Sequence, residues 1–387
     1  MTVRVNKDSF NLREKLSELE RPIGLKGNEL MKSDTLQDVR DLVSAGRKNL
    51  IINGDMRISQ RGVDAPGTGY KSVDRIHMAT STADVRSSQG SLTSGKLYDK
   101  GFRNFVRMTN TSASTANNCY REIDYKMESR DLANSGWVIN NSGSYATLSA
   151  WVRSSVTQKF FVYIRSIGGT TKSYTFGFET IANTWVKIEH TIPGDSTLGV
   201  NNDNTLGMII RFVVDYGPDY TGSSCTEEVW RVTGSDYTPD SSGTWAATAG
   251  ATFDITGLQL EVGKNATDFE YRPYGEELTL CQRYYQNSHH QAAGKYPGNP
   301  DNDNGMIQTC WSDGNSPFGM FPTPMRAAPS VTLRQRGTSN TGKVEVAGAQ
   351  KTASAQQVTN QGVGYIAVTS GVAGSWCAFS YELNAEF

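Results

Sequence analysis

The stretch YATLSAWVRS, residues 145–154, alternates small or apolar residues with polar and aromatic ones. Ala146, Leu148, Ala150 and Val152 fall on one side of an extended chain, which predicts a strand with one face toward a core. Similar runs follow after short polar breaks: KFFVYIRSI (159–167), SYTFGFETI (173–181), WVKIEHTI (185–192), LGMIIRFVVD (206–215) and FDITGLQLEVG (253–263). Many strands at regular spacing predict an antiparallel β-sandwich, and no long helical pattern interrupts them as a parallel α/β sheet would require.

Residues 1–48 differ from the rest of the chain because Leu, Lys, Arg, Asp and Glu dominate them. Two short amphipathic helices are predicted, the first ended by Pro22 and the second by Gly46. Their apolar stripes are Leu12, Leu16 and Leu19, and Leu36, Val39 and Leu42. A short helix cannot bury such a stripe alone. We therefore predict that this segment binds a partner or associates with copies of itself, and a helical cap on the next domain is the alternative.

The composition changes again near residue 275. PFGMFPTPMRAAPSVTLR (317–334) holds four prolines, which belong at strand edges or bends because proline cannot donate to a sheet ladder. VGYIAVTSG (363–371) and SWCAFSYELNAEF (375–387) are predicted closing strands. The predicted organisation is a helical segment at 1–48, a β-sandwich at 49–274 and a smaller, separate β-sandwich at 275–387.

The charge composition restricts the partners of the chain. It has 38 Lys+Arg and 39 Asp+Glu, whereas a large electrostatic nucleic-acid binder normally shows a basic excess. No apolar run approaches the roughly 20 residues that span a bilayer, and the N-terminus MTVRVNKDSF lacks a signal-peptide core. We therefore expect no nucleic-acid partner, no membrane insertion, and folding in a cytoplasm. The five widely spaced cysteines are predicted to be reduced thiols.

The motifs give no positive case for catalysis. The chain contains no G-x-S-x-G, no H-E-x-x-H, no Walker loop and no G-x-G-x-x-G after a strand. Glycoside cleavage needs two carboxylates roughly 5–9.5 Å apart, and no pair of acidic residues stands out by its spacing. We expect a non-enzymatic protein without catalytic residues.

Aromatic residues on predicted loops point to binding instead. Sugars stack their C–H faces on aromatic rings beside polar groups, and Tyr and Trp have the amphipathic character that suits such surfaces. The alternative is that these rings only anchor long loops to the core. A long polar loop at 287–305 adds two adjacent histidines and a tyrosine. The candidate glycan-binding residues are Tyr216, Tyr220, Tyr237, Trp245, His289, His290 and Tyr296.

The stretch NLIINGDMRISQRG, residues 49–62, is the most distinctive in the chain. Its apolar run predicts a core strand at 49–56, and Asn53-Gly54 predicts a turn or bulge. The stretch resembles the opening strand of the jelly-roll module of bacteriophage tail-fibre and other virion structural proteins. Three further segments resemble later landmarks of the same proteins: SVDRIHM (72–78), ITGLQLEVGKNATDFEYRPYGEELTLCQRYYQ (255–286) and FPTPMRAAPSVT (321–332).

This resemblance implies both a fold and a role. The fold would be mainly β, with short N-terminal helices, a jelly-roll β-sandwich and a smaller C-terminal β-sandwich. The protein would be a virion structural protein, assembled in the host cytoplasm as a trimeric tail fibre. Residues 1–48 would attach it to other virion proteins, and residues 275–387 would form the tip that binds host-surface glycan. Related carbohydrate-binding jelly rolls often carry a structural Ca²⁺, for which Asp55 and Glu261 would serve; no other cofactor is expected.

Three alternatives stay open. A capsid fibre or decoration protein would share nearly every feature and differ in the partner of residues 1–48. A glycan depolymerase would use a pair of carboxylates. A secreted or cell-surface lectin of cellular origin is disfavoured by the missing signal peptide.

Overall fold

The computed structural model describes residues 48–82, 84–240, 243–288, 306–335 and 340–387. The chain divides into two compact units, Met1–Lys48 and Asn49–Phe387. Several predicted site residues lie outside the described residues: Leu12, Leu16, Leu19, Leu36, Val39, Leu42, His289, His290 and Tyr296. In the described part of the chain, no helix is long and apolar enough to cross a membrane.

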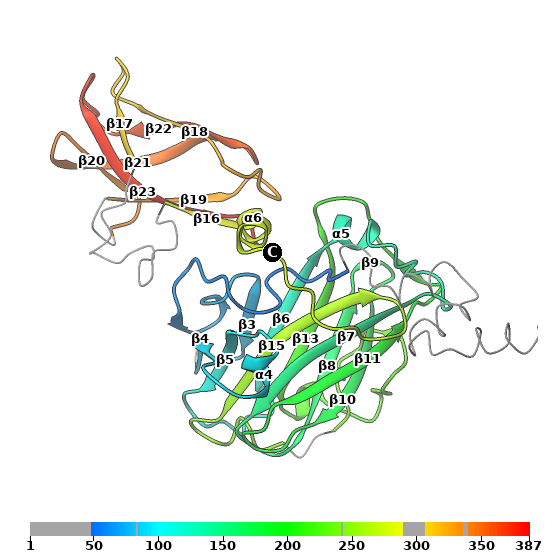
Figure 1. Ribbon diagram of the computed structural model, residues 1–387. Coiled ribbons are helices and arrows are strands. Elements are labelled where there is room, and N and C mark those ends of the chain that lie inside the picture. The colour runs from blue at the N-terminus through cyan, green and yellow to red at the C-terminus, as the bar shows by residue number, and fades with distance from the viewer. Residues whose placement is uncertain (1–47, 83, 241–242, 289–305, 336–339) are drawn as a thin grey trace, which may run out of the picture. The chain divides into compact units, whose positions relative to one another are not determined.

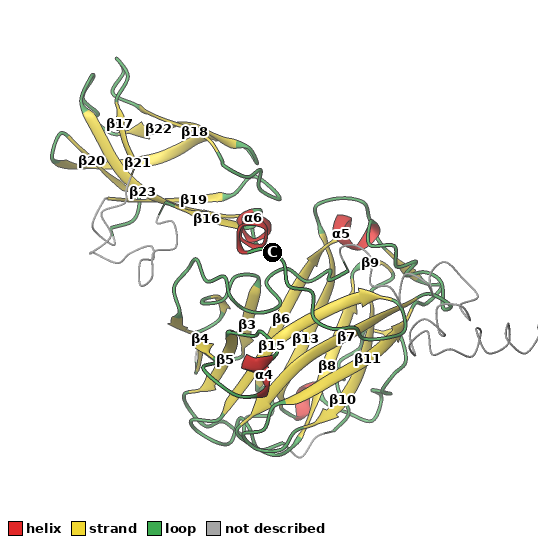
Figure 2. Ribbon diagram, viewed as in Figure 1, coloured by secondary structure: helices red, strands yellow, loops and turns green. Residues whose placement is uncertain are grey.

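Two antiparallel sheets form the predicted β-sandwich (Figures 1 and 2). The first has the order β1 (Asp64–Pro66), β4 (Val85–Ser91), β5 (Asn104–Asn110), β15 (Thr252–Val262), β7 (Tyr145–Ser154) and β11 (Val186–Pro193). The second has the order β14 (Arg231–Val232), β10 (Lys172–Glu179), β8 (Lys159–Ser166), β13 (Leu206–Tyr216), β6 (Tyr120–Glu128), β3 (Ile76–Thr80) and β2 (Gly69–Tyr70). The short strands β9 (Gly168–Gly169) and β12 (Leu198–Gly199) pair with each other. Short helical turns connect the strands: α4 (Lys96–Asp99), α5 (Ser129–Ala133) and η1 (Pro218–Tyr220).

The core lies between these two sheets, as the alternating sequence predicted. The small and apolar residues of β7 are fully buried in it: Ala146, Leu148, Ala150 and Val152. Phe160 of β8 and Phe253 of β15 meet across the two sheets, with their ring centroids 4.9 Å apart. The six runs predicted as strands between 145 and 263 are all strands in the structure.

Residues 49–56 do not form the predicted core strand. Leu50 does donate its backbone N–H to the carbonyl of Leu260 over 2.9 Å, but the chain then leaves the extended conformation. Asn53 and Met56 both have a φ of 61°, which is left-handed backbone that a strand does not contain. The prediction of a turn at Asn53-Gly54 is therefore confirmed, and the prediction of a strand through it is wrong.

The side chain of Asn53 holds this turn together. Its Nδ2 donates to the carbonyls of Ile58 and Asp74, each over 2.9 Å, and its Oδ1 accepts from the backbone N–H of Ile58 over 2.9 Å. Asn suits the position because it tolerates left-handed backbone and offers both donors and an acceptor. Gly54 follows because a Cβ there would lie 2.1 Å from the carbonyl oxygen of Leu258.

The same part of the chain enters a buried group of charged and aromatic residues, which we name the junction: Arg61, Arg75, Tyr284, Tyr285 and Glu386. The carboxylate of Glu386 pairs with Arg61 over 3.4 Å and also with Arg75. The guanidinium carbon of Arg75 lies 3.5 Å from the ring centroid of Tyr284, and that of Arg61 lies 3.7 Å from Tyr285. The junction thus brings residues of three of the four resembling segments together in the interior rather than on an exposed surface.

A second buried contact fixes helix α6 (Tyr274–Gln282), which the sequence did not predict. Arg272, just before the helix, donates to the carbonyl of Ile51 over 3.0 Å and to Glu277 over 3.2 Å. Glu277 also accepts the backbone N–H of Asn53. The helix is therefore held by the same turn that opens the sandwich.

Beyond α6, the chain forms a further set of antiparallel strands centred on β23 (Trp376–Asn384). The strand order is β16 (Tyr285–Asn287), β23, β20 (Lys343–Val346), β21 (Ala349–Val358), β22 (Gly362–Val368) and β18 (Ser316–Met320), and β17 (Met306–Thr309) and β19 (Ser330–Gln335) also pair with β23. Phe318, Phe379 and Leu383 are among the residues of its own buried cluster. The C-terminal β-structure is confirmed, and its separation as a domain at residue 275 stays a prediction.

Replacing Gly54 by alanine should destabilise the fold, because the new Cβ would collide with backbone rather than with a movable side chain. We expect a loss of about 1–3 kcal/mol in the free energy of unfolding, measured by urea denaturation. Gly275→Ala is the matched control, since no atom lies within 4 Å of a Cβ built there. Equal stability of the two variants would contradict this account of the turn.

Candidate functional site

A bulge in β15 shapes the outer face of the first sheet. The pairing of β15 with β7 shifts register between Thr256, opposite Trp151, and Gln259, opposite Ser149. Gly257 lies within the bulge with a φ of 61°, and a Cβ there would be 2.8 Å from Cζ of Phe102 and 3.1 Å from Cδ1 of Trp151. Glycine is therefore required at this position, both for its backbone angle and for the close approach of the two aromatic rings.

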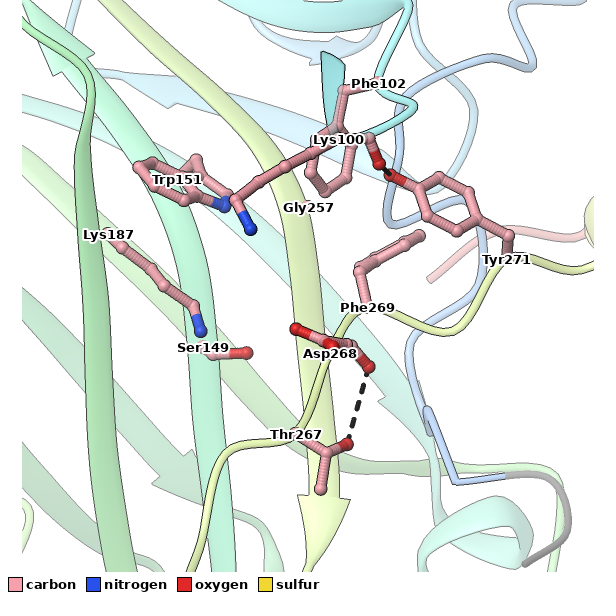
Figure 3. A pocket seen from close by; sticks show the side chains of 10 residues that line it. All are labelled: Lys100, Phe102, Ser149, Trp151, Lys187, Gly257, Thr267, Asp268, Phe269 and Tyr271. Atoms are coloured by element: carbon pink, nitrogen blue, oxygen red, sulfur yellow. Dashed lines mark hydrogen bonds between the residues drawn. The ribbon is translucent and has the colours of Figure 1, made fainter. Parts of the chain in front are cut away.

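Beside the bulge lies a pocket of about 390 Å³, within the size range of small-ligand sites (Figure 3). Its walls come from β7, β11, β15, the loop after α4 and the segment that follows β15. The lining residues are Lys100, Phe102, Ser149, Trp151, Lys187, Gly257, Thr267, Asp268, Phe269 and Tyr271. The prediction of glycan-binding residues from the sequence missed all of them.

Aromatic rings form one side of this pocket. The ring of Phe269 lies 5.2 Å from that of Phe102 and 4.9 Å from that of Tyr271, centroid to centroid. Tyr271 donates its hydroxyl to the backbone carbonyl of Lys100 over 2.7 Å, which joins the segment after β15 to the loop after α4. Tyr271 is 44% exposed, so its ring forms part of the pocket mouth.

Polar groups line the rest of the pocket. Figure 3 shows the indole nitrogen of Trp151, the hydroxyl of Ser149 and the ammonium groups of Lys100 and Lys187 directed into it. Lys187 pairs with Glu189 on its own strand. Asp268 is the acidic residue among those that line the pocket. The arrangement places apolar rings beside hydrogen-bonding groups.

Three of the predicted glycan-binding residues do lie together, over the outer face of the second sheet. The ring centroid of Tyr216 lies 5.6 Å from that of Tyr220 and 5.9 Å from that of Tyr237. Tyr220 and Tyr237 are stacked 6.0 Å apart with an interplanar angle of 14°. We name Tyr216, Tyr220 and Tyr237 the tyrosine cluster. Its rings pack on buried Phe161 and Tyr163, so they also anchor their loops to the sheet.

The prediction for Trp245 is wrong. Its side chain is fully buried within the sandwich core, because the apolar area of the indole outweighs its single polar group. It therefore packs inside the molecule instead of facing a ligand.

A charged group lies beneath the tyrosine cluster. Arg211 binds Asp124 over 2.8 Å and Glu122 over 2.9 Å, and the hydroxyl of Tyr216 donates to Glu122 over 2.5 Å. Burial, followed by the neighbouring charge of Asp124, raises the pKa of Glu122 to about 7. Both Glu122 and Asp124 therefore form ion pairs with Arg211 inside the protein.

The two carboxylates predicted to bind Ca²⁺ each have partners in the protein. Asp55 pairs with Arg57 over 2.6 Å. Glu261 accepts the backbone N–H of Thr267 over 2.8 Å and its hydroxyl over 2.7 Å. Among the residues that the structure describes, no group of three or more His, Cys, Asp or Glu side chains could hold a metal ion. The Ca²⁺ site remains an untested prediction.

No protein-family model matches the chain, and no curated protein matches it in sequence. The solved structures to which the chain is similar include three that are matched along their whole length. Each match covers 57% of the present chain. They are the CBM22-1 xylan-binding domain from Paenibacillus barcinonensis (9% identity, TM-score 0.29), a CBM61 module in complex with β-1,4-galactotriose (10%, 0.27) and a cyclase from Fischerella sp. TAU (10%, 0.33). Similarity of this degree says nothing about a ligand or an activity, and the fold described above rests on the strand pairings themselves.

The raised pKa of Glu122 predicts a pH-dependent stability. A carboxyl whose pKa rises from 4.5 to about 7 on folding contributes stability that is complete below pH 4.5 and is lost as pH rises through 7. Asp124, Arg211, Tyr216 and Lys126 are the neighbours that act on it. Relative to Glu122→Gln, the wild-type protein should therefore lose about 1–3 kcal/mol of unfolding free energy between pH 5 and pH 8.

Urea denaturation at the two pH values measures this difference. Glu179→Gln, at an exposed glutamate of β10, is the control. An unchanged difference between wild type and Glu122→Gln at pH 5 and pH 8 would contradict the prediction.

Proposed function

We propose that this chain is a non-catalytic, glycan-binding structural protein of a bacteriophage virion, built as a trimeric tail fibre. The single observation that supports glycan binding most is the pocket beside Gly257, in which apolar rings and hydrogen-bonding groups face the same space. Its volume, open mouth and mixed lining suit one or two sugar rings better than a large apolar ligand.

The physical fit to a sugar has two parts. A pyranose ring presents C–H groups on its faces, which pack on aromatic rings such as Phe269 and Tyr271. Its hydroxyls lie around the rim, where Ser149, Lys187 and Asp268 offer a hydroxyl, an ammonium and a carboxylate. Asp268 is the acidic residue among those that line the pocket, whereas glycoside cleavage needs a pair of carboxylates, and this supports binding over catalysis.

The virion assignment is supported by the resembling segments of the sequence. The first two of these segments supply residues that shape the turn or the junction: Asn53, Gly54, Asp74 and Arg75. In this proposal residues 1–48 attach the fibre to the particle and join three copies, so that several weak glycan contacts act together. Attachment to the capsid instead of the tail is the alternative.

A glycan depolymerase remains the second candidate function. Glu122 and Asp124 favour it, since they are two carboxylates on one face of β6 and one of them has a raised pKa. Arg211 occupies both carboxylates, and both side chains are buried, which supports the binding function more. Release of new reducing ends from a bound polysaccharide would favour the depolymerase.

Tyr271→Ala should weaken glycan binding by about three- to tenfold, because it removes a ring from the pocket mouth. A glycan array probed with the whole protein identifies the ligand, and calorimetry measures the dissociation constants. Tyr274→Ala is the control, since Tyr274 is similarly exposed at 50% and does not line the pocket. Binding that is equally strong in both variants would contradict the assignment of the site.

The fibre proposal also predicts the oligomeric state of the whole chain. Sedimentation equilibrium at micromolar concentration should give three times the mass of one chain. A monomer under these conditions would contradict the trimer and remove the avidity argument.

A further inference from the structure

We propose that the ligand of the pocket beside Gly257 is an acidic sugar, whose carboxylate is bound by Trp151, Ser149 and Lys100. This inference rests on the proposed glycan binding and narrows it to one chemical class, the hexuronic acids. It comes from the unequal numbers of hydrogen-bond donors and acceptors that face the pocket (Figure 3).

Two buried side chains direct unused polar atoms into this pocket. Trp151 is 8% exposed and Ser149 is 4% exposed, and both lie on the outer face of β7. Among the described residues, neither the indole nitrogen of Trp151 nor the hydroxyl of Ser149 makes a hydrogen bond within the protein, and both atoms face the open space of the pocket. A ligand acceptor in the pocket can bond to these two groups without breaking a hydrogen bond inside the protein, so they indicate where such an acceptor would lie.

The positive charges around the same space are not balanced. Lys100 lines the pocket and forms no salt bridge with any described residue. Lys96 lies nearby, with its Nζ 5.3 Å from the ring centroid of Trp151. Lys187 is paired with Glu189, and Asp268 is the acid that lines the pocket. The free donors near Trp151 are therefore an ammonium and an indole N–H, neither of which can accept a hydrogen bond.

A carboxylate is the ligand group that satisfies such a donor set. It has two oxygens that accept several hydrogen bonds, and those from charged donors are stronger than those between neutral groups. A hexuronic acid carries this carboxylate on a ring whose C–H face can pack on Phe269.

Calorimetry on the whole protein tests this inference. The probes are oligomers of galacturonate, mannuronate and glucuronate, the same oligomers after reduction of their carboxyl groups to alcohols, and polyglutamate. We expect at least one uronate oligomer to bind about tenfold more tightly than its reduced form. Polyglutamate, which carries carboxylates without sugar rings, should bind no better than the reduced oligomers.

Two variants locate the effect within the pocket. Lys100→Gln keeps the side-chain length and removes the charge, and Trp151→Phe keeps an aromatic ring and removes the N–H. Each should weaken uronate binding by about tenfold and should weaken binding of the reduced oligomer less, because hydrogen bonds to a charged carboxylate are stronger than those to an alcohol. Lys343→Gln, at an exposed hydrogen bond to Thr352 in the C-terminal β-structure, is the control. Circular dichroism confirms that the variants are folded.

The outcomes separate this inference from the proposed function. Equal binding of uronate and reduced oligomers would overturn the acidic preference and leave glycan binding intact. Binding of polyglutamate as tight as that of uronate would overturn it as non-specific charge attraction. Failure of every uronate, with a neutral glycan bound on the array, would also overturn it, whereas an array without any bound glycan would overturn the proposed function as well.

Discussion

The buried carboxylate of Glu386 and the two arginines that hold it organise the residues between 49 and 387. Arg75 is fully buried, and a buried charge is stable only when it is paired. Arg61 shares the same carboxylate and stacks on Tyr285. Through these contacts the turn at Asn53 and the residues after α6 become parts of one interior. This explains why Asn49–Phe387 form a single compact unit although their strands make two sets of sheets.

The strands could be predicted from the sequence because period-two alternation directly reflects which face of a strand is buried. The segment at 49–56 could not, since its apolar residues are buried by a turn with positive φ at Asn53 and Met56. An apolar run predicts that its side chains are buried, but it does not predict whether the backbone there is a strand or a turn. Asn53-Gly54 was the signal that correctly opposed a continuous strand, and both residues proved to be required by their contacts.

The site was harder to predict than the fold. Tyr216, Tyr220 and Tyr237 do cluster, but the pocket combines segments that lie far apart in the sequence, from Lys100 to Tyr271. No local sequence pattern indicates that these distant segments lie side by side in the folded chain. One signal was present in ITGLQLE, where a glycine inside a predicted strand indicates a bulge or a close approach of another group. Trp245 was misplaced because aromatic residues serve cores and binding surfaces equally well.

The long sequence separations within the junction have a consequence for how the chain folds. Arg75 and Glu386 are 311 residues apart, and Arg61 and Glu386 are 325 apart. During synthesis from the N-terminus, the sandwich strands emerge well before Glu386, the carboxylate that these two arginines share. The order of folding is therefore constrained, because the sandwich can pair its strands early whereas Arg61 and Arg75 meet Glu386 only after every residue up to it is made. Until then the guanidinium of Arg75 lacks the carboxylate that pairs with it in the folded chain, whereas Arg61 has a second carboxylate partner, Asp74, only 13 residues away in the sequence.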